Sequence, residues 1–358
     1  MTTLFAFVIV LGILIFFHEL GHFLMAKING VGVLKFSLGF GPAIVKKRIG
    51  ETEYRISAIP LGGYVKMLGE DADKEDELTH IDQEKAFSAK SLKARSVIVA
   101  AGPVFNLLLA IVIYTVIAWW GIPSFAPVVG DLVDDSPAYK AGILAGDRIE
   151  SIDGKPVELW EDISFLLQDS TPETRVEMII KRDGNLFTVH VSPVMTSDRN
   201  IFGEEIQRPM IGITRGEEII IKRLGIFSGI GYGFSKTWQV IELTGIALKK
   251  MVDGTLDIKE SLGGPILIAQ VSGETFRAGM LPFFFMIAFV SINLALINIL
   301  PIPVLDGGHL LFFLIEGITG RPVEGRPREI AQQIGLFLLI LLMLFAFYND
   351  LIRVFKGD

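Results

Sequence analysis

Four long runs of apolar residues dominate the pattern of hydrophobic and polar positions along this chain. Each run is close to or above the length of about 20 residues that an α-helix needs to cross the hydrocarbon core of a bilayer. The runs predict transmembrane helices at 1–26, 96–121, 281–309 and 328–350. The sequence therefore predicts an α-helical multipass membrane protein with four transmembrane helices.

The segment 27–95, between the first two predicted spans, has a different pattern. Its first half alternates short apolar strands with glycine and proline and has a turn signal at Gly50, which is typical of β-hairpins. Its second half contains EDADKEDELTHIDQEK, a sequence that predicts a solvated, charged loop. We expect membrane-associated or re-entrant β-hairpins followed by this loop.

Two more segments separate the second and third predicted spans. The segment 124–216 combines short strands, turn signals and one helix near 159–168, and predicts a single inserted α/β domain. The segment 224–280 begins with an apolar stretch of spanning length. Charged side chains interrupt this stretch at Lys236, Glu242, Lys249 and Lys250. It therefore predicts an amphipathic interfacial helix followed by a linker.

Composition and charge exclude several classes of protein. Of the 358 residues, 51% are hydrophobic and 20% are charged, which is less charge than a soluble chain of this length carries. The net charge of −7, with no basic stripe, argues against a nucleic-acid partner. The chain has no cysteine, so disulfides, thiolate nucleophiles and thiolate metal ligands are excluded.

The basic residues near the predicted spans indicate an orientation, because cytoplasmic loops are enriched in Lys and Arg. They are concentrated in 27–95 and after the third span, at Arg321, Arg326 and Arg328. We therefore expect these two segments to be cytoplasmic, and the N-terminus, the inserted domain and the C-terminus to lie outside. The first and third spans then both end on the cytoplasmic side.

The sequence HELGH in the first predicted span places costly polar residues inside a bilayer. His18 and His22 are four residues apart, so a helix presents both imidazoles on one face, with Glu19 beside them. This is the HExxH pattern of zinc hydrolases, in which the histidines ligate the metal and the glutamate takes a proton from water. A catalytic zinc site needs a third protein ligand.

The third ligand must come from a distant segment. Asp306 is the best candidate, because it follows the proline-interrupted sequence INILPIPVLDGG at the predicted depth of the two histidines. His309, three residues further on, is the second choice. Glu316 is a further candidate. His80 in the charged loop and His190 in the inserted domain lie at less suitable positions.

Several motifs resemble those of the bacterial site-2 proteases, which are zinc intramembrane metalloproteases of the regulator-of-sigma-E-protease type. These motifs are HELGH, AAGPVFN and NILPIPVLDGG in or after the first three spans, together with FSLGFGP, IPLGGYVKM and SLGGPILIAQ. The resemblance covers essentially the whole chain. The inserted domain, with SPAYKAGILAGDRIESIDGKPV, resembles one PDZ domain of the bacterial protease kind, whereas larger relatives carry two.

The resemblance implies a set of site residues around a Zn2+ ion: the metal ligands His18, His22 and Asp306, the catalytic Glu19, and the substrate-binding Asn298 and Asn293. Asn106 in AAGPVFN is interpreted as a residue of helix packing.

The resemblance also implies an activity, which is regulated intramembrane proteolysis in a bacterial inner membrane. The enzyme would hydrolyse a peptide bond within or near the transmembrane segment of single-pass proteins already trimmed outside, such as anti-sigma factors or remnant signal peptides. The PDZ-like domain would bind an extended peptide or a C-terminus. The alternative is a catalytically idle membrane receptor or scaffold that binds partners through this domain, and a third hypothesis is a metal transporter.

Overall fold

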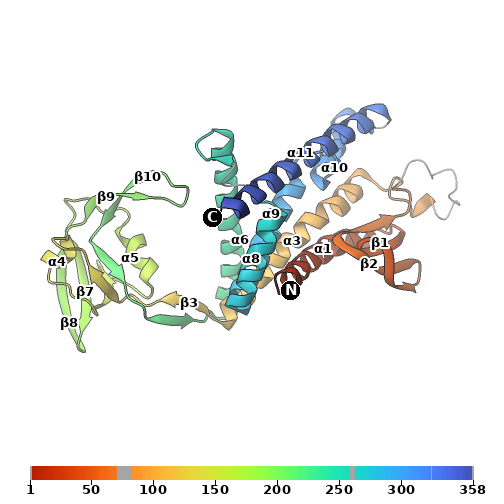
Figure 1. Ribbon diagram of the computed structural model, residues 1–358. Coiled ribbons are helices and arrows are strands. Elements are labelled where there is room, and N and C mark those ends of the chain that lie inside the picture. The colour runs from red at the N-terminus through yellow and green to blue at the C-terminus, as the bar shows by residue number, and fades with distance from the viewer. Residues whose placement is uncertain (1, 71–82, 259–262, 324, 357–358) are drawn as a thin grey trace. The chain divides into compact units, whose positions relative to one another are not determined.

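The computed structural model describes residues 2–70, 83–258, 263–323 and 325–356. The chain divides into two compact units. The helical unit comprises Met1–Val116 and Phe227–Asp358, and the strand-rich unit comprises Ile117–Ile226 (Figure 1).

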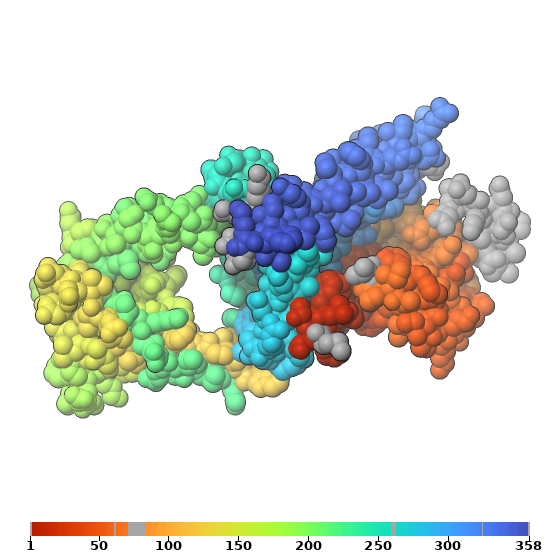
Figure 2. Space-filling view, in the orientation of Figure 1, coloured from red at the N-terminus to blue at the C-terminus, as the bar shows by residue number. Residues whose placement is uncertain are grey.

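Four helices in the described residues are long and apolar enough to cross a membrane. They are α1 (Thr2–Ile28), α3 (Leu92–Trp120), α9 (Met280–Ile299) and α11 (Arg326–Lys356). Their number agrees with the four predicted spans. Most side chains of α11 are exposed, and in Figure 2 this helix forms a long dark-blue ridge on the surface of the helical unit.

An apolar cluster packs α1 against α3 and α9. On α1 it uses Ala6, Val10 and Leu14, which are four residues apart and therefore share one face. Further along α1, a Cβ atom built at Gly21 would lie 2.3 Å from the main-chain oxygen of Ala101 on α3. The backbones of α1 and α3 thus approach closely at this level, which only glycine permits.

The predicted span 281–309 is divided in the structure. Helix α9 ends at Ile299, and a new helix, α10 (Asp306–Thr319), begins at Asp306. The two prolines of the sequence PIPVL end α9, because proline cannot continue the helical hydrogen-bond pattern. Within the connection Val304 has a φ of 127°, a strained conformation for a β-branched residue.

The helix α6 (Ile226–Val252) occupies the place of the predicted amphipathic helix. Its buried residues are Gly229, Gly233, Thr237 and Val240, so it buries a narrow face of mostly small side chains. A Cβ atom at Gly233 would lie 2.2 Å from the hydroxyl oxygen of Thr115, so this face packs tightly against α3.

A second helix, α8 (Pro265–Ala278), lies in the segment that was predicted to be a linker. Its N-terminus is capped from a distance by Asp350 of α11, which is 1% exposed. The Asp350 carboxylate accepts hydrogen bonds from the main-chain N–H groups of Gly264, Ile266 and Leu267, at 2.9, 2.8 and 3.1 Å. A carboxylate at this end of a helix satisfies N–H groups that lack partners within the helix.

The predicted β-hairpins form one long hairpin in the structure. The strands β1 (Val33–Ile49) and β2 (Thr52–Met67) are antiparallel neighbours around the predicted turn at Gly50, whose φ is 60°. The expectation of several hairpins is therefore corrected to one. Gly39 has a φ of 90°, which lets β1 bend at this position. A Cβ atom here would also lie only 2.7 Å from the main-chain oxygen of Ile59.

The bend lets the hairpin fold back on itself beside α1 (Figure 1). Residues 33–38 of β1 pair with 63–67 of β2 on one side and with 53–56 on the other. The inner face packs against α1 and α3 through a cluster of Ala26, Val31, Val33, Phe36, Val65, Met67 and Ile98. This packing fixes the hairpin against the two helices.

The strand-rich unit consists of small sheets and two short helices. Its four-stranded sheet has the order β6 (Lys155–Pro156), β5 (Arg148–Ile152), β7 (Val176–Arg182) and β8 (Asn185–Val191). The remaining strands pair in twos: β3 (Ile122–Phe125) with β12 (Ile219–Lys222), β4 (Val129–Leu132) with β11 (Ile213–Arg215), and β9 (Val194–Arg199) with β10 (Glu205–Met210). The helices are α4 (Pro137–Lys140) and α5 (Trp160–Leu167). The β9–β10 hairpin was not predicted.

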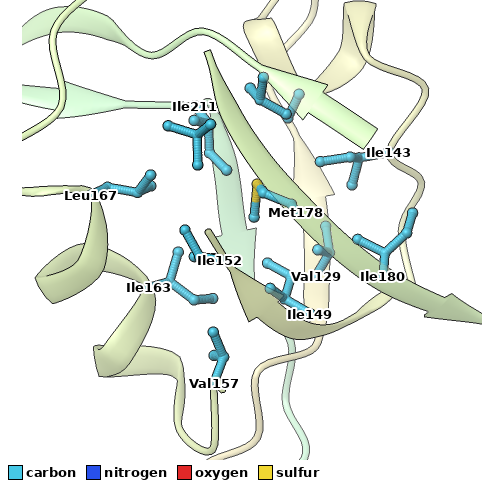
Figure 3. Close-up of a cluster of buried hydrophobic side chains, with 13 residues drawn as sticks. Val129, Ile143, Ile149, Ile152, Val157, Ile163, Leu167, Met178, Ile180 and Ile211 are labelled. Atoms are coloured by element: carbon cyan, nitrogen blue, oxygen red, sulfur yellow. The ribbon is translucent and has the colours of Figure 1, made fainter. Parts of the chain in front are cut away.

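The core of this unit is apolar. Figure 3 shows Ile163 and Leu167 of α5 pointing toward the sheet residues Ile152 and Met178. Nearby, Arg182 donates to both carboxylate oxygens of Asp147, each at 2.7 Å, and this pairing raises the pKa of Arg182. Asp147 is 1% exposed, so the pair neutralises a buried charge.

Candidate metal centre

The HELGH sequence lies in α1, as predicted, and its two histidines face the same point. The Nε2 atoms of His18 and His22 lie 3.2 Å apart. They reach this separation because residues four apart lie on adjacent turns of one helix face. Two nitrogens that converge in this way form a natural pair of metal ligands.

Asp306, the first residue of α10, brings its carboxylate to the same point. Its Oδ2 atom lies 3.2 Å from Nε2 of His18, and its Oδ1 atom lies 3.6 Å from Nε2 of His22. One ligand atom from each of the three residues lies within 4.8 Å of the other two. Among the described residues, His18, His22 and Asp306 form the cluster of side chains that could hold a metal ion. The structure therefore brings together the three residues that the sequence analysis selected as ligands.

The arrangement fits a zinc ion. Tetrahedral coordination with bonds of 2.0–2.2 Å separates neighbouring ligand atoms by about 3.3–3.6 Å, close to the three distances observed. The Oδ2 atom of Asp306 is buried and accepts no hydrogen bond within the part of the chain that the structure describes. A cation held by two imidazoles and this carboxylate would satisfy that atom.

One face of α3 forms a wall of the centre. Ile98, Gly102 and Asn106 are spaced by four residues and so share this face. Nδ1 of His22 lies 2.9 Å from the main-chain oxygen of Ile98, and a Cβ atom at Gly102 would lie 2.3 Å from Nε2 of His22. The first contact orients the imidazole, and the absence of a side chain at Gly102 leaves room for it.

Glu19 lies beside the ligands and is almost completely buried, at 9% exposure. It is also next to the hairpin, because a Cβ atom at Gly63 of β2 would lie 3.0 Å from its Cγ atom. A carboxylate between a metal centre and a strand is well placed to exchange protons with water or with a bound peptide.

The two asparagines predicted to bind substrate lie on α9. Asn298 is half-buried near the C-terminal end of this helix. Asn293 donates to the main-chain oxygen of Phe289 at 2.8 Å and accepts a bond from the Thr244 hydroxyl of α6 at 3.5 Å. Asn293 thus contributes to the contact between α6 and α9.

The other candidates for the third ligand have different surroundings. His309 on α10 is not part of the group formed by His18, His22 and Asp306. Glu316 is paired with Arg95 of α3 at 2.6 Å, and His190 belongs to the strand-rich unit. His80 lies outside the described residues.

The contribution of α3 is not predicted from the sequence. Asn106, interpreted there as a packing residue, lies with its Nδ2 atom 3.4 Å from Nδ1 of His18. The signal available in the sequence was the spacing of Ile98, Gly102 and Asn106. That spacing identifies a helix face but not the helix that it contacts.

Comparisons with known proteins concern the chain as a whole. Residues 6–342 match the model of Peptidase family M50. A Mesorhizobium japonicum protein named "Putative zinc metalloprotease" is 37% identical, with 98% of each chain covered. The Bacillus subtilis protein named "Regulator of sigma-W protease" is 31% identical, with 99% of each chain covered.

A solved PDZ domain of an SdrC-like protein from Listeria monocytogenes covers 26% of this chain and 85% of its own. The two are 22% identical and have a TM-score of 0.20, a likeness too weak to establish the fold of the strand-rich unit.

Proposed function

Because this chain belongs to peptidase family M50, we propose that it is a zinc-dependent endopeptidase that cleaves single-pass membrane proteins within or near their transmembrane segments. Family membership confirms the predicted resemblance to the site-2 proteases and the predicted metallopeptidase class. The observation that carries the proposal is the convergence of His18, His22 and Asp306, with α1 itself long and apolar enough to cross a membrane.

The three converging residues hold zinc in this proposal, and the names of the relatives as zinc metalloproteases support that choice of metal. When bound, the ion supplies Lewis acidity, which lowers the pKa of water and polarises a peptide carbonyl. Two imidazoles and one carboxylate leave one position of a tetrahedral site open, as a catalytic centre requires.

Glu19 is the proposed general base and acid. It accepts a proton from the attacking water and later delivers that proton to the leaving amine. Its side chain has little contact with solvent, so few water molecules compete for the proton. Asn298 and Asn293 are proposed to hold the substrate main chain, the latter after exchanging its contact with Thr244.

A substrate helix must unwind locally, because its scissile carbonyl is otherwise hydrogen-bonded within the helix. Residues 63–65 of β2 pair with β1 on one side, and no other described strand pairs with these three residues. We propose that the unwound segment adds to this edge as a strand, next to Glu19. Proline substitutions along 63–65 should slow cleavage while zinc content stays constant, and unchanged turnover would count against the edge.

The strand-rich unit is proposed to be a PDZ-like domain that binds an extended peptide or a C-terminus of pre-trimmed substrates. We propose a topology in a bacterial inner membrane in which this domain and both chain termini lie outside. The metal centre then lies toward the cytoplasmic side. The positions of Arg321, Arg326 and Arg328 support this orientation.

Cleavage of a single-pass substrate in detergent tests the activity. The Glu19→Gln variant should retain zinc and lose about 10²–10⁴-fold in turnover, because the amide cannot exchange the proton. Glu242→Gln, an exposed change on α6, is the matched control and should cleave normally. If Glu19→Gln cleaves at the wild-type rate, the assignment of the base is wrong.

A further inference from the structure

The side chain of Asn106 is fully buried beside the metal centre, and the structure shows a conflict in its contacts. Its Nδ2 atom lies 3.4 Å from Nδ1 of His18. Its Oδ1 atom is buried and accepts no hydrogen bond from the described residues. A buried amide oxygen without a donor is costly, so this arrangement calls for a physical explanation.

The imidazole of His18 also lacks a suitable partner when its other nitrogen binds a metal. A neutral histidine has one N–H group and one lone pair, and a metal takes the lone pair. Nε2 of His18 is the atom that faces Nε2 of His22 and the carboxylate of Asp306. Nδ1 of His18 must then carry the hydrogen, and it would point an N–H group at the N–H groups of the Asn106 amide.

Exchanging the positions of Oδ1 and Nδ2 of Asn106 gives the buried oxygen a donor and gives the N–H group of His18 an acceptor. The oxygen then accepts the N–H of His18 Nδ1, and the buried acceptor gains a donor. Asparagine oxygen and nitrogen have nearly the same size, so the exchange needs no movement of α3.

His22 provides an independent parallel on the same helix face. Its Nδ1 atom lies 2.9 Å from the main-chain oxygen of Ile98, which can only accept. The main chain therefore fixes the tautomer of His22. Asn106 is eight residues further along α3, on the same face, and occupies the equivalent place beside His18.

We propose that Asn106 is a positioning residue: its side-chain oxygen accepts the Nδ1–H of His18 and so leaves Nε2 free for the metal. The inference rests on the proposed zinc centre. Histidine ligands in metal sites are commonly oriented by such an acceptor, and loss of the acceptor typically weakens metal binding by about 10–100-fold.

Two substitutions of Asn106 separate positioning from packing. In Asn106→Asp the side chain can only accept, so it keeps the proposed bond, whereas a contact made by Nδ2 would be lost. In Asn106→Leu the shape is similar but no acceptor remains. Ser291→Ala is the matched control, because the Ser291 hydroxyl donates to the main-chain oxygen of Asn106 at 2.8 Å and contacts no ligand.

The measurement is the zinc affinity of the full-length protein in detergent, obtained by competition with a chelator, together with the absorption spectrum of the Co2+-substituted protein. We expect affinity to fall about 10–100-fold in Asn106→Leu, with an altered Co2+ spectrum. Asn106→Asp and Ser291→Ala should bind zinc as tightly as the wild type.

Two outcomes would overturn the proposal: wild-type affinity in Asn106→Leu, or a loss in Asn106→Asp that equals the loss in Asn106→Leu. Should Asn106→Leu not fold, the affinity of Asn106→Asp still decides, because retention supports an accepting role and loss contradicts it. If the wild type binds no zinc, or if His18→Ala leaves zinc binding intact, the zinc centre of the proposed function fails instead.

Discussion

The two units of this protein bury polar groups in opposite ways. The strand-rich unit fills its core with apolar side chains (Figure 3). It pairs its buried carboxylate, Asp147, with Arg182. The helical unit instead gathers buried polar groups where α1 and α3 meet, among them Glu19, His22 and Asn106. The difference suggests that side-chain loss should affect stability in one unit and chemistry in the other.

The largest expected effect is the loss of a ligand in the helical unit. Asp306→Ala should remove zinc and lower cleavage by about 10⁴-fold or more, because acid–base catalysis and electrostatic stabilisation both depend on the metal. Metal analysis and a cleavage assay measure this. His190→Ala, which removes a partly exposed histidine of the strand-rich unit, should leave the zinc content unchanged. Equal zinc loss in both variants would contradict the assigned centre.

The next effect tests the wall of the centre. In Gly102→Ala the added methyl would meet the His22 imidazole at 2.3 Å, so the ligand must move. A displacement of about 1 Å can lower turnover about 10²-fold, and we expect a loss of that size. Gly12→Ala in α1 is the control, because a Cβ atom there has nothing within 4 Å. Normal turnover in Gly102→Ala would show that the imidazole has more space than the structure indicates.

In the strand-rich unit, the loss of a buried side chain should lower the free energy of unfolding. Met178→Ala removes a fully buried side chain and should destabilise the unit by about 2–5 kcal/mol. Amide hydrogen exchange of the whole protein can measure this for the protected residues of the unit. Leu186→Ala, at a side chain that is 65% exposed, should have little effect. If zinc content falls in Met178→Ala, the two units are coupled more strongly than the comparison implies.

The smallest effect concerns a buried hydroxyl in α6. The Thr237 oxygen has no hydrogen-bond partner in the described ranges, so Thr237→Val should be neutral or stabilise the protein by up to about 1 kcal/mol. Thr244→Val, which removes the bond to Asn293, should instead destabilise it by about 0.6 kcal/mol. Thermal unfolding in detergent shows whether each variant is more or less stable than the wild type. A destabilised Thr237→Val would indicate a partner for that hydroxyl.

Local patterns in the sequence were enough to predict the four long apolar helices and the shared face of His18 and His22 on α1. The choice of Asp306 as the third ligand also needed the predicted orientation of the spans and the family resemblance. Hydropathy is a property of consecutive residues, and the spacing of His18 and His22 is a property of a single helix. The prolines of PIPVL marked an interruption before Asp306 for an equally local reason, but the span was predicted as 281–309 and the separate helix α10 was not predicted.

The parts that were not predicted depend on contacts between distant segments. Gly102 and Asn106 acquire their roles only when α3 faces α1. The hairpin β9–β10 has mostly exposed residues, so no alternation of buried and exposed positions marks it. Helix α8 begins at residues that need the carboxylate of Asp350, which is 86 positions from Gly264 in the chain.

This last contact has a consequence for how the protein is assembled during translation. Asp350 leaves the ribosome after α8, α9 and α10 have all been synthesised. The N-terminus of α8 therefore cannot be capped until that time. Until α11 inserts, the N–H groups of Gly264, Ile266 and Leu267 lack the partner that they have in the finished molecule. A nascent chain that stops before residue 350 should therefore expose this end of α8 to quality-control proteases.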